Sequence, residues 1–191
     1  MGVFEYIGVL VSVIMGLGIT HIATGTSKTV QHRDTVRVYI PHTLWTVNIL
    51  IYILMIWWGM FWWSGHEDWY AYEYLFITLY AIVLFFLASM LYPWDMEPDI
   101  DFEASFFRNR RWFFGALTLA WLIDIPETLL KSGAGLREVP ADYAVFVSIE
   151  LVIALTGFFS RNHRVHLLLP VIYLSFTLFY VLSSVVGRID A

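Results

Sequence analysis

Long apolar segments alternate with short polar stretches along the whole chain. The apolar segments cover residues 3–25, 38–63, 74–92, 112–130, 143–159 and 165–186. Most are close to the roughly 20 residues that an α-helix needs to cross about 30 Å of hydrocarbon. The period-two alternation of membrane β-strands is absent, so helices must satisfy the spanning backbone. The pattern predicts an all-α membrane protein: one domain over residues 1–191, built as a six-transmembrane-helix bundle.

Composition supports a lipid environment. Of the 191 residues, 59% are hydrophobic and only 14% are charged, whereas soluble domains carry about 25% charged residues. The net charge of −5 and the lack of a basic face argue against a nucleic-acid partner. The chain has no Cys, which excludes disulfides, thiolate metal sites and thiol catalysis. No phosphate-binding glycine loop or nucleophile elbow is present, so we do not expect an enzyme.

Basic residues predict the orientation of the helices. One set of loops holds Lys28, Arg33, Arg37, Arg108, Arg110, Arg111, Arg161 and Arg164, and the other set holds Lys131, Arg137 and Arg188. The positive-inside rule therefore places the first set in the cytoplasm and both termini outside. The first apolar segment has no basic residue before it, so we expect a retained helix rather than a cleaved signal peptide.

Aromatic residues gather around the second loop. They are Trp57, Trp58, Trp62, Trp63, Trp69, Tyr70 and Tyr72. Such rings mark membrane interfaces, so we interpret them as an aromatic belt on the outer side; ligand binding by these Trp residues is the alternative.

A row of small residues runs along the first predicted helix at every fourth position. Its members are Gly8, Ser12, Gly16, Thr20 and Thr24. Small side chains allow a neighbouring backbone to approach closely. The row therefore predicts helix packing inside the bundle or an oligomer contact between protomers, and the sequence leaves both open.

Two carboxylates fall inside predicted spans on different helices. They are Glu150 in the fifth and Asp124 in the fourth, just before Pro126. Ionisable groups in a membrane are costly unless they are paired or hydrated, so both are functional candidates. One interpretation is a proton relay; the other is a buried structural network that includes Asn48. Glu127 and Lys131, one turn apart, predict a structural ion pair.

Polar stripes occur on two further predicted helices. The second carries His42, Trp45, Asn48 and Tyr52 on one face, and the sixth carries His166, Pro170, Tyr173, Thr177 and Tyr180. A row of hydroxyl groups is typical of a hydrated path or an interhelical seam. We expect the two stripes to line one space.

The histidines suggest a different chemistry. His21, His42 and His166 lie toward the cytoplasmic ends of three predicted helices. Two such imidazoles can ligate haem, and three can hold a transition metal. The alternative for His32, His163 and His166 is contact with lipid headgroups, in which case the protein needs no cofactor.

The longest predicted cytoplasmic loop is rich in acids. It contains Asp95, Glu97, Asp99, Asp101 and Glu103, followed by the arginines at 108, 110 and 111. These acids predict either a divalent-cation or partner-docking site, or a short interfacial helix from about Asp101 whose Phe102, Phe106 and Phe107 enter the headgroups.

Two short stretches carry a family resemblance. Residues 15–21 (Met-Gly-Leu-Gly-Ile-Thr-His) and residues 108–114 (Arg-Asn-Arg-Arg-Trp-Phe-Phe) resemble a group of small, uncharacterised bacterial inner-membrane proteins. The resemblance loosely covers the chain and implies a multi-pass protein of the bacterial cytoplasmic membrane. It implies no activity.

These observations favour a small channel or transporter for a proton, an ion or a small polar solute. Glu150 and Asp124 would be its carboxylates, with Asn48, Tyr173 and Thr177 along the path. Because so small a bundle has little interior space, we expect a homo-oligomer. The alternatives are a non-catalytic subunit of a larger membrane assembly and a haem or metal protein using the histidines.

Overall fold

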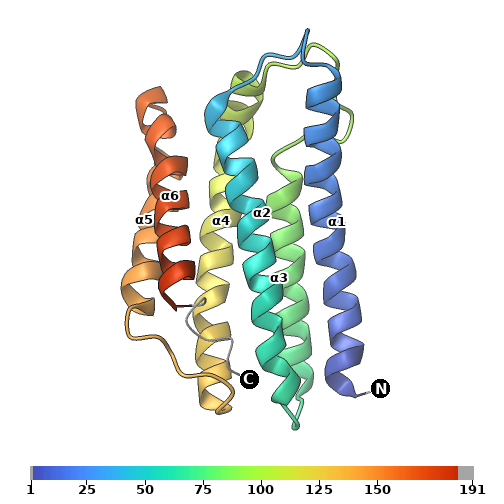
Figure 1. The fold of residues 1–191 in the computed structure, drawn as a ribbon, viewed down its shortest axis with the longest axis vertical. Helices are drawn as coiled ribbons and strands as arrows, with labels where there is room; N and C mark the ends of the chain where they lie inside the picture. Colours follow the sequence, from blue (N-terminus) through green and yellow to red (C-terminus); the bar gives the residue numbers. More distant parts are fainter. Residues whose placement is uncertain (1, 185–191) are drawn as a thin grey trace.

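The computed structural model describes residues 2–184, and over these residues the chain is helical. The helices are α1 (Val3–Gln31), α2 (Ile40–Gly59), the 3-10 helix η1 (Met60–Gly65), α3 (Ala71–Ser89), α4 (Phe102–Gly133), α5 (Tyr143–Phe159) and α6 (His163–Ser184). Successive α-helices run in opposite directions (Figure 1). Residues 185 and 186 of the last predicted span and Arg188 lie outside the described residues.

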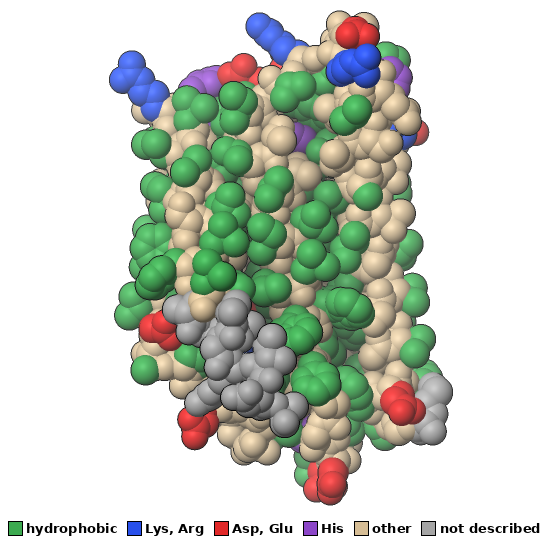
Figure 2. Space-filling view, viewed as in Figure 1, with side chains coloured by type: hydrophobic (Ala, Val, Ile, Leu, Met, Phe, Trp, Pro, Cys, Tyr) green, Lys and Arg blue, Asp and Glu red, His purple; other side chains and the backbone are tan. Residues whose placement is uncertain are grey.

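Five of these segments are long and apolar enough to cross a bilayer. They are α1, α2 together with η1, α3, α4 and residues His163–Leu182 of α6. The remaining helix, α5, is apolar but has only 17 residues. Large hydrophobic side chains cover much of the outer surface (Figure 2). The chain thus has the helices and the surface of a multi-pass membrane protein.

The helices form one bundle with α2 and α4 near its centre. α1 packs on α2 and α3, α4 packs on α3 and α5, and α6 packs on α2 and α5 (Figure 1). Two glycines permit close contacts. A Cβ atom at Gly25 would lie 2.2 Å from the ring of Tyr92, and one at Gly157 would lie 2.3 Å from the ring of Phe114. Aromatic rings occupy the space that these glycines leave.

α4 begins earlier than the predicted span. Asp101 is its N-cap, with Oδ1 accepting a 3.0 Å hydrogen bond from the amide of Ala104, so a helix does start where the acidic loop suggests. It then continues without a break to Gly133 instead of ending as a separate interfacial helix. Phe102 and Phe106 are buried among protein side chains, so the expectation that they enter the headgroups is wrong. The continuous helix turns them toward the bundle.

The two ends of the bundle differ in charge. On the face shown in Figure 2, Lys and Arg side chains gather at the end where α1, α3 and α5 finish, whereas acidic side chains lie at both ends. We call these the basic end and the cavity end, because the cavity described below lies toward the second.

Candidate functional site

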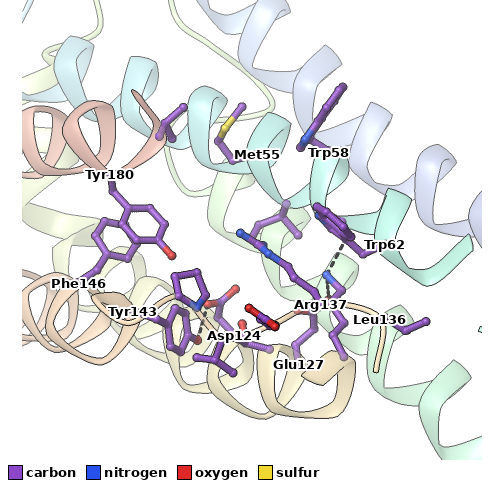
Figure 3. Close-up of a pocket in the computed structure, with 18 of the residues that line it drawn as sticks. Met55, Trp58, Trp62, Asp124, Glu127, Leu136, Arg137, Tyr143, Phe146 and Tyr180 are labelled. Carbon is purple, nitrogen blue, oxygen red and sulfur yellow. Dashed lines mark hydrogen bonds and ion pairs between the residues drawn. The ribbon is translucent and has the colours of Figure 1, made fainter. Parts of the chain in front are cut away.

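A cavity of about 840 Å³ lies between α2, α4, α5 and α6 in the half of the bundle nearest the cavity end. Aromatic side chains form much of its wall: Trp58, Trp62, Trp121, Tyr143, Phe146 and Tyr180 (Figure 3). The rings of Phe146 and Tyr180 stack at 3.9 Å on one side. Such a size and lining are typical of a site for a small molecule.

Asp124 lies in the wall of this cavity and is held by two phenols. Tyr80 donates a 3.0 Å hydrogen bond to Oδ1, and Tyr143 donates a 2.8 Å hydrogen bond to Oδ2 (Figure 3). The Tyr80 hydroxyl also contacts that of Tyr52 at 3.0 Å. Among the residues described, no Lys, Arg or His forms an ion pair with Asp124. Over residues 2–184, Asp124 thus presents a carboxylate to the cavity that forms no ion pair, although Lys131 acts on it electrostatically.

The neighbouring acid, Glu127, is neutralised instead. Its Oε1 atom lies 2.6 Å from the Lys131 ammonium and accepts a 2.9 Å hydrogen bond from the indole of Trp63. Lys131 also donates to the carbonyl of Gly59 at 2.8 Å. The predicted Glu127–Lys131 pair is confirmed, and it joins α4 to the end of α2.

Glu150 lies deeper in the bundle and is fully buried. Thr177, which also lines the cavity, donates a 3.2 Å hydrogen bond to Oε1 of Glu150. The Oε2 atom has no hydrogen-bond partner among the described residues. Tyr52 interacts electrostatically with both Glu150 and Asp124. The two predicted carboxylates thus flank the same inner end of the cavity.

Asn48 and Tyr173 lie at the contact between the two polar stripes. Asn48 donates a 2.9 Å hydrogen bond to the carbonyl of Pro170, and the ring of Trp45 contacts that of Tyr173 at 5.1 Å. The stripes of α2 and α6 therefore do face each other. They form a packed seam toward the basic end and separate only where Thr177 borders the cavity.

Aromatic rings close the bundle on the basic side of Glu150. Trp45 is fully buried, and its indole contacts Phe113 at 5.4 Å and Phe114 at 5.3 Å. Phe114 in turn fills the space left by Gly157. We call Trp45, Phe113, Phe114 and Tyr173 the aromatic plug.

Each of the three candidate histidine ligands donates to a backbone carbonyl. His21 binds the carbonyl of Tyr92 at 2.9 Å, His42 that of Leu91 at 2.7 Å, and His166 that of Ser160 at 3.0 Å. A carbonyl can only accept, so each Nε2 atom carries the hydrogen. Within residues 2–184, no three His, Asp or Glu side chains are grouped so as to hold a metal ion. The haem or metal alternative gains no support from these contacts.

The row of small residues on α1 lies mostly toward the outer surface, although Ser12 accepts a 3.3 Å hydrogen bond from the indole of Trp57 on α2. Ser12 and Thr20 are exposed, and a Cβ atom at Gly8 or Gly16 would meet no atom within 4 Å. The row thus contacts the bundle at Ser12, and packing through its other members stays a prediction. The buried stripe of α1 is the neighbouring one, with Ile7, Val11, Met15 and Gly18. An oligomer contact through the row stays a prediction.

Two other polar clusters differ from expectation or were missed. Trp63 is buried on Glu127 and is not part of a lipid-facing belt, although Trp57, Trp58, Tyr70 and Tyr72 are exposed. Glu73 is buried beside His66 at 3.1 Å, a pair that no sequence pattern indicated. The one local indication of a role for Glu73 is its position three residues after Tyr70 at the start of α3. The Glu73 carboxylate accepts a 2.9 Å hydrogen bond from the backbone amide of Tyr70.

The acidic loop is tied to the connection between α1 and α2. Asp101 pairs with Arg37 at 3.1 Å, and the backbones of the two residues form an isolated β-bridge. The hydrogen bond from the Ala104 amide holds the pKa of Asp101 below its ordinary value, and Arg37 adds to this effect. Glu103 contacts His163 at 2.8 Å. At least two of these acids thus connect helices.

Comparisons with known proteins supply no relative. No protein-family model, no curated protein and no solved structure matches this chain. The functional argument therefore rests on the chemistry of the cavity.

Proposed function

We propose that the protein is a small membrane transporter that binds a cationic solute in its cavity and couples its passage to protons. The observation that carries the proposal is Asp124, a carboxylate in the wall of an aromatic cavity of about 840 Å³ that two phenols bind and that forms no ion pair with any described residue. Aromatic faces attract cations, and an anionic group in a low-dielectric site does so more strongly. The cavity thus has the chemistry of a site for a small organic cation.

Glu150 is the proton-carrying group in this proposal. Thr177 borders the cavity and hydrogen-bonds Glu150, so protons can reach the deeper acid from the cavity side. Buried carboxylates on separate helices are the usual material of intramembrane proton relays. Asn48 and Tyr173 extend the polar seam beyond Glu150 toward the basic end.

The aromatic plug favours a transporter over an open channel. A channel needs a continuous hydrated path, whereas the rings around Trp45 close the bundle beyond Glu150. A protein that is open at one end and closed at the other fits one state of an alternating-access cycle. The solute would enter from the cavity end, and rearrangement of the plug would release it at the basic end.

The proposed setting is the bacterial cytoplasmic membrane, with six spans and both termini outside. α5 would be the shortest span, at about 25 Å for 17 residues. The basic end would face the cytoplasm by the positive-inside rule. A homo-oligomer is part of this proposal, because the small-residue row of α1 lies on the outer surface.

Equilibrium binding of radiolabelled tetraphenylphosphonium to the detergent-solubilised protein tests the site. We expect saturable binding that Asp124→Asn weakens by about tenfold or more, since loss of the site's anion removes at least about 1.4 kcal/mol. Glu138→Gln is the matched control, because Glu138 also lines the cavity but is exposed. Equal loss in both variants, or no saturable binding, would contradict the proposal.

Proton flux into liposomes that contain a trapped pH-sensitive dye tests the role of Glu150. Wild-type protein should acidify the lumen in response to an imposed gradient, and the solute should alter that rate. Glu150→Gln should abolish the flux while the protein still folds, because the amide cannot carry a proton. Full flux in the Gln variant would remove Glu150 from the mechanism.

A second candidate function is a non-catalytic subunit that docks in a larger membrane assembly. It is favoured by the exposure of the α1 row, which contacts little within the bundle. The chain has no Cys, so single-cysteine variants at Gly8 and Gly16 give unambiguous crosslinks. A crosslinked homodimer supports the transporter oligomer, whereas a crosslink to a different chain supports the assembly.

A further inference from the structure

Arg110 is a buried cation for which the described part of the chain supplies no anion. It projects from α4 at the basic end, is 3% exposed, and forms no ion pair among the residues described. Its Nη1 atom is enclosed and has no hydrogen-bond partner there. An unpaired buried charge costs several kcal/mol, so such a group ordinarily has a counterion. Arg110 thus lacks a counterion among residues 2–184.

The charges around Arg110 have the same sign. Arg161 and Arg111 act on it electrostatically, and Arg110 in turn acts on His166. The acids nearby in sequence are engaged elsewhere: Asp101 pairs with Arg37, and Glu103 with His163. Positive charge therefore accumulates at this point of the basic end.

The connection between α5 and α6 borders the same place. The carbonyl of Ser160 accepts a hydrogen bond from the Nε2–H of His166. The Nδ1 atom of His166 is buried and has no hydrogen-bond partner among the described residues. Asn162 caps α6 by accepting a 2.9 Å hydrogen bond from the amide of Arg164. The first turn of α6 adds the positive end of a 22-residue helix. Arg110 thus lies near His166 and a helix start, with an N–H donor that has no partner among the described residues.

A shallow apolar groove runs along the outer face of α5 and ends at Ser160, which directly precedes Arg161. It is lined by Val152, Leu155, Thr156, Phe159 and Ser160. Phe159 is 75% exposed, and Trp112, one turn of α4 from Arg108, is 69% exposed. A membrane protein exposes such side chains to lipid. A cationic group at one end of an apolar groove complements the two parts of an anionic phospholipid, its charged headgroup and its acyl chains.

We propose that Arg110, Arg161 and the start of α6 form a binding site for the phosphate of an anionic phospholipid, with an acyl chain along the α5 groove. Guanidinium groups suit phosphate oxygens because their N–H donors match them in pairs. The site is distinct from the cavity, and it stands whether or not the cavity carries a cation. Basic pockets between helices at this depth are a recurrent form of lipid recognition.

Native mass spectrometry of lipid-depleted protein in mild detergent tests the site. The probes are dioleoylphosphatidylglycerol, zwitterionic dioleoylphosphatidylcholine and inorganic phosphate. We expect the wild type to retain the anionic lipid preferentially, and Arg110→Gln to weaken that binding about tenfold. Arg108→Gln is the matched control, because Arg108 is exposed on the same helix. No preference for the anionic lipid, or equal loss in the control, would overturn the proposal.

Thermal unfolding separates ligand binding from a structural role. Without lipid, Arg110→Gln should melt at or above the wild-type temperature, because the variant no longer buries an unpaired charge. The anionic lipid should raise the melting temperature of the wild type and of Arg108→Gln but not of Arg110→Gln. A variant that unfolds without lipid would make Arg110 structural and overturn the proposal.

Two further measurements fix the source of the phosphate. Arg161→Gln alters an exposed residue and should fold normally, yet it should weaken binding of the anionic lipid; unchanged binding would remove Arg161 from the site. Inorganic phosphate should neither stabilise the protein nor compete with the lipid at millimolar concentration. If it stabilises as well as the lipid does, the site takes a free anion and the lipid assignment is wrong.

Discussion

Tyr143, the first residue of α5, donates a 2.8 Å hydrogen bond to Asp124, which lies well inside α4. This contact joins the cavity end of the shortest helix to its longest neighbour. It also fixes the orientation of the carboxylate, because Tyr80 binds the other oxygen from α3. One acidic side chain thus sets the spacing of three helices around the cavity.

The variant Tyr143→Phe should destabilise the protein by about 1 kcal/mol. Hydrogen bonds between membrane helices average less than this, but a buried carboxylate left with one donor costs more. Unfolding in increasing dodecyl sulfate measures the change. Tyr72→Phe is the control, because Tyr72 is exposed at the same end of the bundle. Equal stability of the two variants would show that the bond to Asp124 adds nothing.

The Glu127–Lys131 pair should behave as one unit. Either Glu127→Gln or Lys131→Met alone leaves the charge of the other residue buried and unpaired. Each single variant should therefore lower the free energy of unfolding by about 3 kcal/mol. The double variant should cost clearly less than the sum, because neither charge is then left buried. A double-mutant cycle of unfolding free energies measures the coupling. Additive losses would mean that each residue acts through other contacts, such as Trp63 or Gly59.

Gly157 and Gly16 should respond oppositely to the same substitution. Gly157→Val forces a side chain against the ring of Phe114, so we expect a loss of about 1–3 kcal/mol. A Cβ atom at Gly16 would meet no neighbouring atom within 4 Å, so Gly16→Val should leave the stability of the bundle unchanged. Thermal unfolding at low protein concentration compares them. A loss at Gly16 that grows with protein concentration would locate the oligomer contact there.

Asp101 should make the start of α4 sensitive to acid. Its folded-state pKa is lowered mainly by the Ala104 amide, so its stabilising effect is present above the unfolded value of 3.8. That effect is lost as the pH falls through the lower folded value. Hydrogen exchange at the Ala104 amide between pH 3 and 6 should show faster opening at the acid end. Asp101→Asn should flatten this dependence; an unchanged profile would assign it to another group.

The sequence predicted the helices because length and apolarity suffice for them. Apolar runs of about 20 residues in a row leave no alternative to helices in lipid. Contacts between residues one helical turn apart could also be predicted. The spacing of Glu127 and Lys131 alone indicated their ion pair. The facing stripes of α2 and α6 were predicted for a similar reason, since polar side chains in lipid need a partner.

Rotation of a helix about its axis was harder to predict. In a membrane, both the lipid-facing and the buried sides are apolar, so the pattern that orients a soluble helix is weak. The sequence therefore left open whether Gly16 packs inside the bundle or contacts another protomer; a Cβ atom there would meet no atom within 4 Å. Trp63 was assigned to the lipid interface although it binds Glu127. Arg110 counted only as a topological charge, because its burial depends on how α4 sits against α5 and α6.

The contacts of His21 and His42 bear on how the bundle can move. They come from α1 and α2, and they bind the carbonyls of Tyr92 and Leu91, just beyond the end of α3. These two hydrogen bonds therefore hold α1 and α2 to the end of α3 on the basic side of the bundle. At the cavity end, α2 and η1 are instead connected to α4 by the hydrogen bonds from Lys131 to Gly59 and from Trp63 to Glu127. If the helices rock against one another, they would pivot near His21 and His42. The largest displacement would then be at the mouth of the cavity.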